Sequence, residues 1–128
     1  MFPGNLANNM KLKLKFLIFC AAAALPAMGA GSSTTVTGWV LDSACAYTKA
    51  LTKPISSECA IACAKQGSPL VILTDDGAIY LPVADTMPAK EQNTRLLPFA
   101  GKRVTVTGTA YERSGSHAIV IEKIEPAS

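Results

Sequence analysis

The segment over residues 103–111 alternates strictly between small or apolar side chains and polar ones. Apolar or small residues stand at Val104, Val106, Gly108 and Ala110, and the intervening positions hold Arg103, Thr105, Thr107, Thr109 and Tyr111. A period of two places each set on one face of a β-strand, whereas an amphipathic helix repeats its apolar positions every three or four residues. The chain is therefore predicted to fold around a sheet with one buried face.

Four further segments have the composition of strands. Residues 34–41 alternate valine and glycine with threonine and tryptophan, which favours a pleated segment. Residues 70–73 and 78–83 flank Asp75-Asp76-Gly77, whose glycine can supply the positive φ of a tight hairpin. Residues 117–124 form a β-branched run that follows a turn at Gly115. Five strands are expected in total.

Two segments that interrupt the strands are predicted to be helical. Ser56 or Ser57 can cap a helix that carries two cysteines and stops at Gly67. Residues 89–97 lie between two prolines and contain good helix formers, which predicts a short helix or a turn. The fold class is therefore mainly β: a small five-stranded OB-like barrel, with a cysteine-bearing helix inserted between the first two strands and a short helix before the last two.

Residues 1–30 have the pattern of a secretory signal peptide. Three lysines precede an apolar run over residues 16–24, and small residues follow it. The run is shorter than the roughly 20 residues that cross a bilayer, and no later segment is long and apolar enough to do so. Residues 1–9 do not fit this pattern, so a start at Met10 suits it better. We expect one domain over residues 31–128, exported to the periplasm or the extracellular space.

The basic character of the whole chain comes from this leader. Of 12 lysines and arginines, three are Lys11, Lys13 and Lys15, which leaves nine against nine aspartates and glutamates. The expected mature domain is thus close to neutral. Because nucleic-acid binding usually needs a basic stripe with interleaved aromatic residues, we predict no nucleic-acid partner.

Three cysteines fall in the expected mature domain: Cys45, Cys59 and Cys63. An exported thiol usually forms a disulfide, binds a soft metal or carries redox chemistry. If the first two strands are neighbours, the end of the intervening helix lies near Cys45, which favours a disulfide between Cys45 and Cys63 over the alternative with Cys59. Closing this loop would stabilise the fold by about 3 kcal/mol in the chain-entropy model. One thiol is then left over.

The same cysteines allow a second hypothesis. Cys59 and Cys63 fall one turn apart on one helical face, where two thiolates with Cys45 nearby could hold Cu(I) or another soft ion. His117 is the only histidine of the chain, so a strong fourth ligand is missing. The three cysteines are therefore weak metal candidates, and we predict no metal or other cofactor. The C-x-x-x-C spacing also differs from the C-x-x-C of thioredoxin-type sites.

A resemblance to a known family extends over most of the expected mature domain. The sequence AGKRVTVTG at residues 100–108, with DSAC at 42–45, CAIAC at 59–63 and Gly67, resembles an uncharacterised family of small exported bacterial OB-like domains. The resemblance implies the same barrel and assigns no activity. Members of that family commonly carry a histidine four residues after the first cysteine. Lys49 stands at that position here, which weighs against a shared metal site.

No catalytic constellation is visible in the sequence. It has no phosphate-binding glycine loop, no H-x-x-x-H pair and no nucleophile elbow. Asp75 and Asp76 are expected to be turn residues, His117 an edge residue and Trp39 a core residue. We predict a noncatalytic protein that binds a protein, glycan or small ligand or has a structural role in the cell envelope. The alternative is a thiol-based redox or copper-binding protein that uses Cys59 and Cys63.

Overall fold

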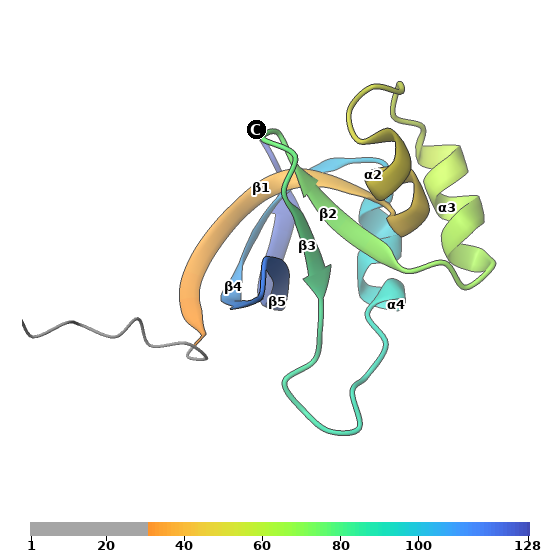
Figure 1. Ribbon diagram of the computed structural model, residues 1–128. Coiled ribbons are helices and arrows are strands. Elements are labelled where there is room, and N and C mark those ends of the chain that lie inside the picture. The colour runs from red at the N-terminus through yellow and green to blue at the C-terminus, as the bar shows by residue number, and fades with distance from the viewer. Residues whose placement is uncertain (1–30) are drawn as a thin grey trace, which may run out of the picture.

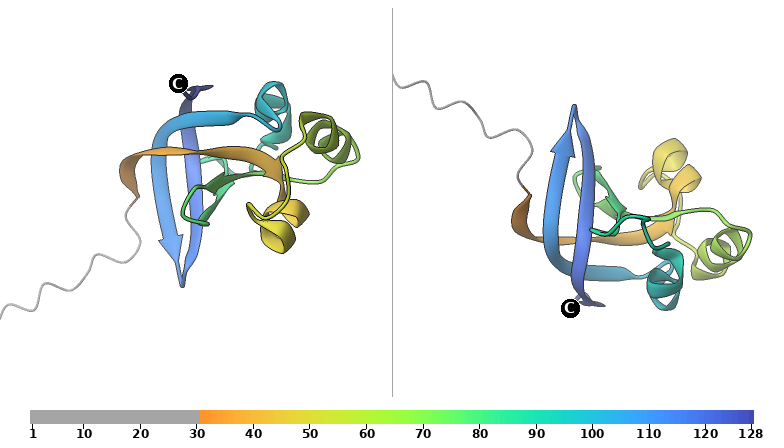
Figure 2. Two further views of the ribbon diagram at one scale, coloured as in Figure 1. Left: turned by 90° about the horizontal axis from the view of Figure 1, so that it is seen from above. Right: turned by 90° about the horizontal axis from the view of Figure 1, so that it is seen from below.

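The computed structural model describes residues 31–128, and the predicted signal peptide lies outside the described residues. The described chain forms a closed barrel in the order β1-β2-β3-β5-β4, with three short helices on one side of it (Figures 1 and 2). In chain order the elements are β1 (Ser32–Asp42), α2 (Ser43–Lys49), α3 (Ser57–Lys65), β2 (Leu70–Thr74), β3 (Ile79–Pro82), α4 (Asn93–Leu96), a 3-10 turn (Leu97–Phe99), β4 (Arg103–Arg113) and β5 (Ser116–Pro126). The predicted mainly β, OB-like barrel is confirmed.

Strand β1 joins the two halves of the barrel, because it pairs with both β2 and β4. It pairs antiparallel with β2 through its second half and with β4 through most of its length. The barrel closes where β3 runs parallel to β5, and the β4–β5 hairpin completes the ring. The alternation predicted for β1 and β4 holds, because Val36, Val40, Val104 and Val106 are all buried in the interior.

The interior of the barrel is filled by aliphatic side chains from every strand except the short β3 and by residues of the helices. Its buried members are Val36, Val40, Ala60, Ala64, Leu70, Ile72, Leu96, Ala100, Val104, Val106, Ile119 and Ile121. Leu96 of α4 is fully buried and closes one end of the barrel. Arg95, its neighbour, donates hydrogen bonds to the Ile121 and Glu122 carbonyls of β5, where the β4–β5 register shifts by one residue.

Helix α2, which carries Cys45, lies in a segment for which the sequence predicts no helix or strand. The side chain of Asp42 accepts a hydrogen bond from the Cys45 N–H at 3.1 Å, which caps the helix and satisfies one of its free donors. Asp42 therefore caps α2 at the exit of β1. The signal for α2 is weak in the sequence, because the helix has only seven residues and a single buried one, Ala46.

A second, smaller core lies outside the barrel beneath α2. Leu41, Ala46, Val71 and Leu73 are buried there, and the partly buried Trp39, Ile55 and Ile79 pack against them. Trp39 is thus a packing residue, as predicted, although it packs on the outer face of the sheet. The outer face of β2 and β3 is the surface on which OB folds commonly bind oligonucleotides and oligosaccharides. Here α2 covers the β2 half of that surface.

The ends of α3 are those predicted. The Ser56 side chain accepts from the Cys59 N–H, and Gly67 takes a φ of 97° just after the helix. Helix α4 is shorter than the predicted 89–97, because the Glu91 carboxylate accepts from the Thr94 N–H and thereby starts the helix only after residue 92. None of the helices within residues 31–128 is long and apolar enough to span a bilayer.

Candidate functional site

The three cysteines of residues 31–128 all lie within the connection from β1 to β2, on helices α2 and α3. Cys45 lies in the first turn of α2, Cys59 in the first turn of α3, and Cys63 one turn further along α3. All three are free thiols; Cys59 is exposed, and the other two are half-buried. Cys59 and Cys63 lie close together but not at disulfide distance. The bridge between Cys45 and Cys63, or its alternative with Cys59, stays a prediction.

Asp42 is the charged neighbour of this cluster. Both of its carboxylate oxygens accept hydrogen bonds, one from the Cys45 N–H and one from the Ser68 hydroxyl, and its side chain is buried. Burial raises the pKa of the Cys63 thiol above its ordinary value, and the negative charge of Asp42 raises it further. The neighbouring thiols of Cys59 and Cys45 raise the pKa of Cys63 in the same direction, which favours its neutral form in the free protein.

The space between α2 and α3 is small. Asp42, Cys45 and Cys59 help to line a cavity of about 20 Å³ between the two helices. A cavity of this size has room for about one water molecule. No group of three or more histidine, cysteine, aspartate or glutamate side chains within residues 31–128 is arranged to hold a metal ion. The cluster therefore contains neither a three-ligand metal centre nor a pocket for an organic molecule.

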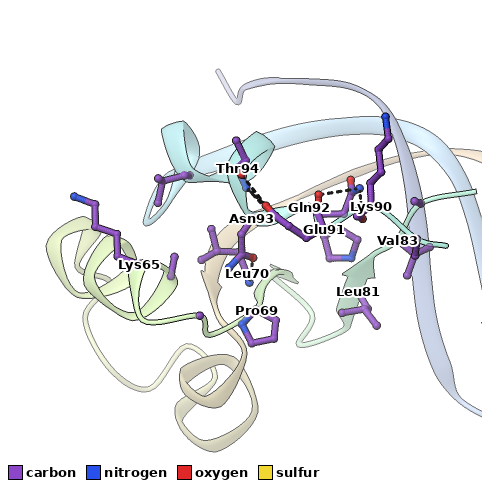
Figure 3. Close-up of a pocket in the computed structure, with 16 residues that line it drawn as sticks. Lys65, Pro69, Leu70, Leu81, Val83, Lys90, Glu91, Gln92, Asn93 and Thr94 are labelled. Carbon is purple, nitrogen blue, oxygen red and sulfur yellow. Dashed lines mark hydrogen bonds between the residues drawn. The ribbon is translucent and has the colours of Figure 1, made fainter. Parts of the chain in front are cut away.

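A larger groove, which the sequence does not predict, lies between the start of β2, the end of β3 and α4 (Figure 3). Its volume is about 610 Å³, within the usual range for small-molecule sites. Most of its lining is apolar, including Pro69, Leu81, Val83 and Leu97. Leu81 remains 45% exposed although it is a large apolar residue. No local sequence pattern marks this groove, because its walls come from segments that are distant in the chain.

The groove exists because β2 and β3 separate after two residue pairs, the last of which joins Ile72 to Tyr80. Beyond that pair, the edge of β2 is satisfied by a side chain. Asn93 Oδ1 accepts from the Leu70 N–H at 2.9 Å, and Asn93 Nδ2 donates to the Ser68 carbonyl at 2.7 Å. The carboxamide thus replaces the peptide group of a neighbouring strand.

The opposite edge of the groove is formed by Pro82 of β3. The Val83 N–H donates to the Ile119 carbonyl of β5. Because backbone polar groups of successive strand residues point to opposite sides, the backbone nitrogen of Pro82 faces away from β5 and towards the groove, although Pro82 is the register partner of Ile119. A proline at this position has no N–H to leave unsatisfied. Few backbone N–H groups therefore remain free at the groove, because Asn93 accepts from Leu70 and residue 82 is a proline.

The charged residues of the groove are at its rim. Lys65 and Lys90 lie at opposite ends, and their ammonium groups extend away from its centre (Figure 3). The Glu91 carboxylate is occupied, because it accepts hydrogen bonds from the N–H and the hydroxyl of Thr94. These bonds lower the pKa of Glu91 below its ordinary value. The middle of the groove is thus left to apolar and neutral polar side chains.

The remaining residues singled out by the sequence have structural surroundings. Asp75 pairs with Arg103 at 2.6 Å, and Asp76 accepts from Thr74 in the β2–β3 turn, so the prediction of a turn is confirmed. His117 begins β5 beside a turn, as predicted, and its ring centre lies 5.2 Å from that of Tyr80. His117 also borders a shallow hollow of about 410 Å³ between α2 and the β4–β5 turn.

No protein-family model, curated protein or solved structure matches this chain. Its function is therefore inferred from the chemistry of the groove and of the thiol cluster.

Proposed function

We propose that this protein is a small noncatalytic binding module whose OB-like barrel holds a predominantly apolar small molecule in the groove between β2, β3 and α4. The observation that carries the proposal is the groove of about 610 Å³ with its mostly apolar lining. Small-molecule sites are typically concave, mainly apolar and equipped with a few polar groups for orientation. Gln92 and Asn93 at the groove wall provide such polar groups.

Two other classes of ligand fit this molecule less well. An extended peptide that adds a strand needs free backbone donors and acceptors at a sheet edge. Asn93 and Pro82 leave few of these at the groove. An oligosaccharide or oligonucleotide would need the outer face of β2 and β3, which α2 partly covers through Ala46.

The site of action is a separate part of the proposal. We place the protein outside the cytoplasm, after removal of residues 1–30, because that segment combines a basic start, a short apolar run and small residues at its end. Intact mass of the protein recovered from the periplasm or culture medium tests this directly. A mass that includes residues 10–30 in every fraction would contradict export.

Binding can be tested with the neutral apolar dye Nile red and one charge introduced into the groove. Leu81→Asp places a carboxylate at the apolar wall, and burying that charge against a bound apolar molecule should weaken saturable dye binding by about tenfold or more. Leu51→Asp is the matched control, because Leu51 is 42% exposed, as Leu81 is 45% exposed, but lies outside the groove. Equal effects of both variants, or no saturable binding by the unmodified protein, would refute the proposal.

A further inference from the structure

The two cysteines of α3 are four residues apart on one helix, and this spacing does not allow a disulfide between them while the helix stays regular. In an α-helix, residues four apart keep their Cβ atoms about 5–6 Å from each other. A disulfide needs about 3.5–4.5 Å between Cβ atoms. Cys59 and Cys63 approach to 4.2 Å without being bonded. Bridging them would require the helix to unwind locally.

Helix α3 is fixed firmly enough to resist such unwinding. Ser56 caps its first turn, and the Ser68 N–H donates to the Cys63 carbonyl at its end, which closes the C-terminal turn. On the face that packs against the barrel, Ala60 and Ala64 are buried. The cysteine pair therefore remains two separate sulfur atoms one helical turn apart.

Two sulfurs at this spacing can share one metal ion. With a metal–sulfur bond of about 2.3 Å, the value for zinc, a single ion can join sulfur atoms up to about 4.6 Å apart. Sulfur ligands select soft ions, Cu(I) among them. Zinc usually takes four protein ligands in a structural site, and no set of even three is arranged for a metal in the described part of the chain. A two-sulfur site instead suits monovalent soft ions, which accept two ligands.

We propose that Cys59 and Cys63 form a two-sulfur binding site for a soft monovalent metal ion of the Cu(I) type, open to solvent through the exposed Cys59. Both thiols lose their protons to solvent as the ion binds, so the ligands in the complex are thiolates. Cys45 is a neighbour of this site and not a ligand. The site goes beyond the proposed function of the groove, which none of the three cysteines lines. A disulfide from Cys45 to Cys63 would withdraw one ligand, so that bridge and the metal site exclude each other.

The test is anaerobic titration of the reduced full-length protein with Cu(I) bicinchoninate, in a Cys20→Ser background that removes the thiol of the leader. We expect stoichiometric transfer of Cu(I) to the protein. Cys59→Ser and Cys63→Ser should each abolish the transfer, whereas Cys45→Ser should retain it. No transfer to the reduced protein, or an equal loss in Cys45→Ser, would overturn the proposal.

A second measurement requires no cysteine substitution in the cluster. Alkylation by N-ethylmaleimide, followed by peptide mass spectrometry, reports the reactivity of each thiol in the same chain. Addition of Cu(I) should protect Cys59 and Cys63 from alkylation and leave Cys45 as reactive as before. Protection of all three thiols, or of none, contradicts a site made by the α3 pair. Circular dichroism of each serine variant verifies that α3 is still folded.

Discussion

Helices α3 and α4 are attached to the same barrel in different ways. Helix α3 packs closely, with the small side chains of Ala60 and Ala64 on the core, and its first residue, Ser57, nearly touches the backbone at Gly101. Helix α4 inserts one large side chain, Leu96, and is otherwise tied to the strands by side-chain hydrogen bonds. Close backbone packing holds α3 directly against the barrel at Gly101. Helix α4 stands off from β2 and β3, so a groove remains there, and the C-terminal end of α3 with Ala64 and Lys65 forms part of its wall.

The comparison predicts that the attachment of α4 depends on a single apolar residue. Leu96→Ala should destabilise the protein by about 2–5 kcal/mol, because it removes a fully buried side chain and leaves a cavity at the end of the barrel. Urea unfolding measures the effect, with Leu51→Ala as the control at an exposed leucine. A cost of less than about 1 kcal/mol would mean that the polar contacts of α4 hold it without Leu96.

The attachment of α3 should instead depend on the absence of a side chain at residue 101. A Cβ at Gly101 would lie 2.4 Å from the Ser57 Cα, and the φ of Gly101 is 73°. Gly101→Ala therefore combines backbone strain with a clash against α3. Its effect should exceed that of Gly115→Ala by about 1–3 kcal/mol, the usual cost of overpacking.

Gly115 is the matched control for this experiment, because its φ is 82° and a Cβ there would meet nothing within 4 Å. Both variants pay the cost of a left-handed alanine, about 1–2 kcal/mol, so their difference isolates the contact with α3. Equal free energies of unfolding for the two variants would show that α3 can move away from residue 101 at little cost.

The polar attachment of α4 should have a smaller effect. Asn93→Ala leaves the Leu70 N–H and the Ser68 carbonyl without their partner, at a cost of about 1–2 kcal/mol for groups that water reaches in part. Hydrogen exchange of the Leu70 amide should accelerate with it. Gln92→Ala is the control, because the Gln92 amide bonds only to carbonyls of the preceding two residues. Unchanged exchange at Leu70 would contradict the role of Asn93 as a substitute strand.

The strands and α3 could be predicted from sequence because their signals are local. Alternation over residues 103–111 specifies a strand without reference to the rest of the chain, and Ser56 with Gly67 marks both ends of α3. The β2–β3 turn is equally local, since Asp76 and Gly77 supply its side-chain acceptor and its positive φ. Such patterns operate within a few residues.

The groove could not be predicted because its walls come from distant segments. The Asn93 side chain accepts a hydrogen bond from the Leu70 N–H, although Leu70 lies 23 residues earlier in the chain. No sequence pattern around either residue predicts this contact. Helix α2 could not be predicted for a related reason. Its packing partners Val71 and Leu73 lie in strand β2, which is distant from it in the chain. The sequence identified the three cysteines of the cluster. The distances from Cys45 to the other two could not be predicted, because they depend on how α2 and α3 pack.

The smallest expected effect is the loss of the Glu91 hydrogen bonds at the start of α4 when acid protonates the carboxylate. The Glu91 carboxylate accepts from the Thr94 N–H at 2.8 Å and from its hydroxyl at 2.7 Å, which lowers the pKa of Glu91. Because the folded-state pKa lies below the unfolded one, this cap stabilises the fold fully above the unfolded value and is lost as pH falls through the folded value. The loss thus begins as pH falls into the ordinary titration range of glutamate, and it is complete only in stronger acid, below the lowered pKa of Glu91.

The Thr94 amide resonance in an NMR titration reports this transition at the cap itself. Its midpoint should lie below that of an unperturbed glutamate, and Glu91→Gln, which keeps an acceptor oxygen without a titrating proton, should remove the transition. A midpoint at or above the ordinary value would mean that the cap is not formed in solution. Helix α4 would then begin without a fixed first turn, and the wall of the groove that carries Gln92 would be less well defined than that formed by α3.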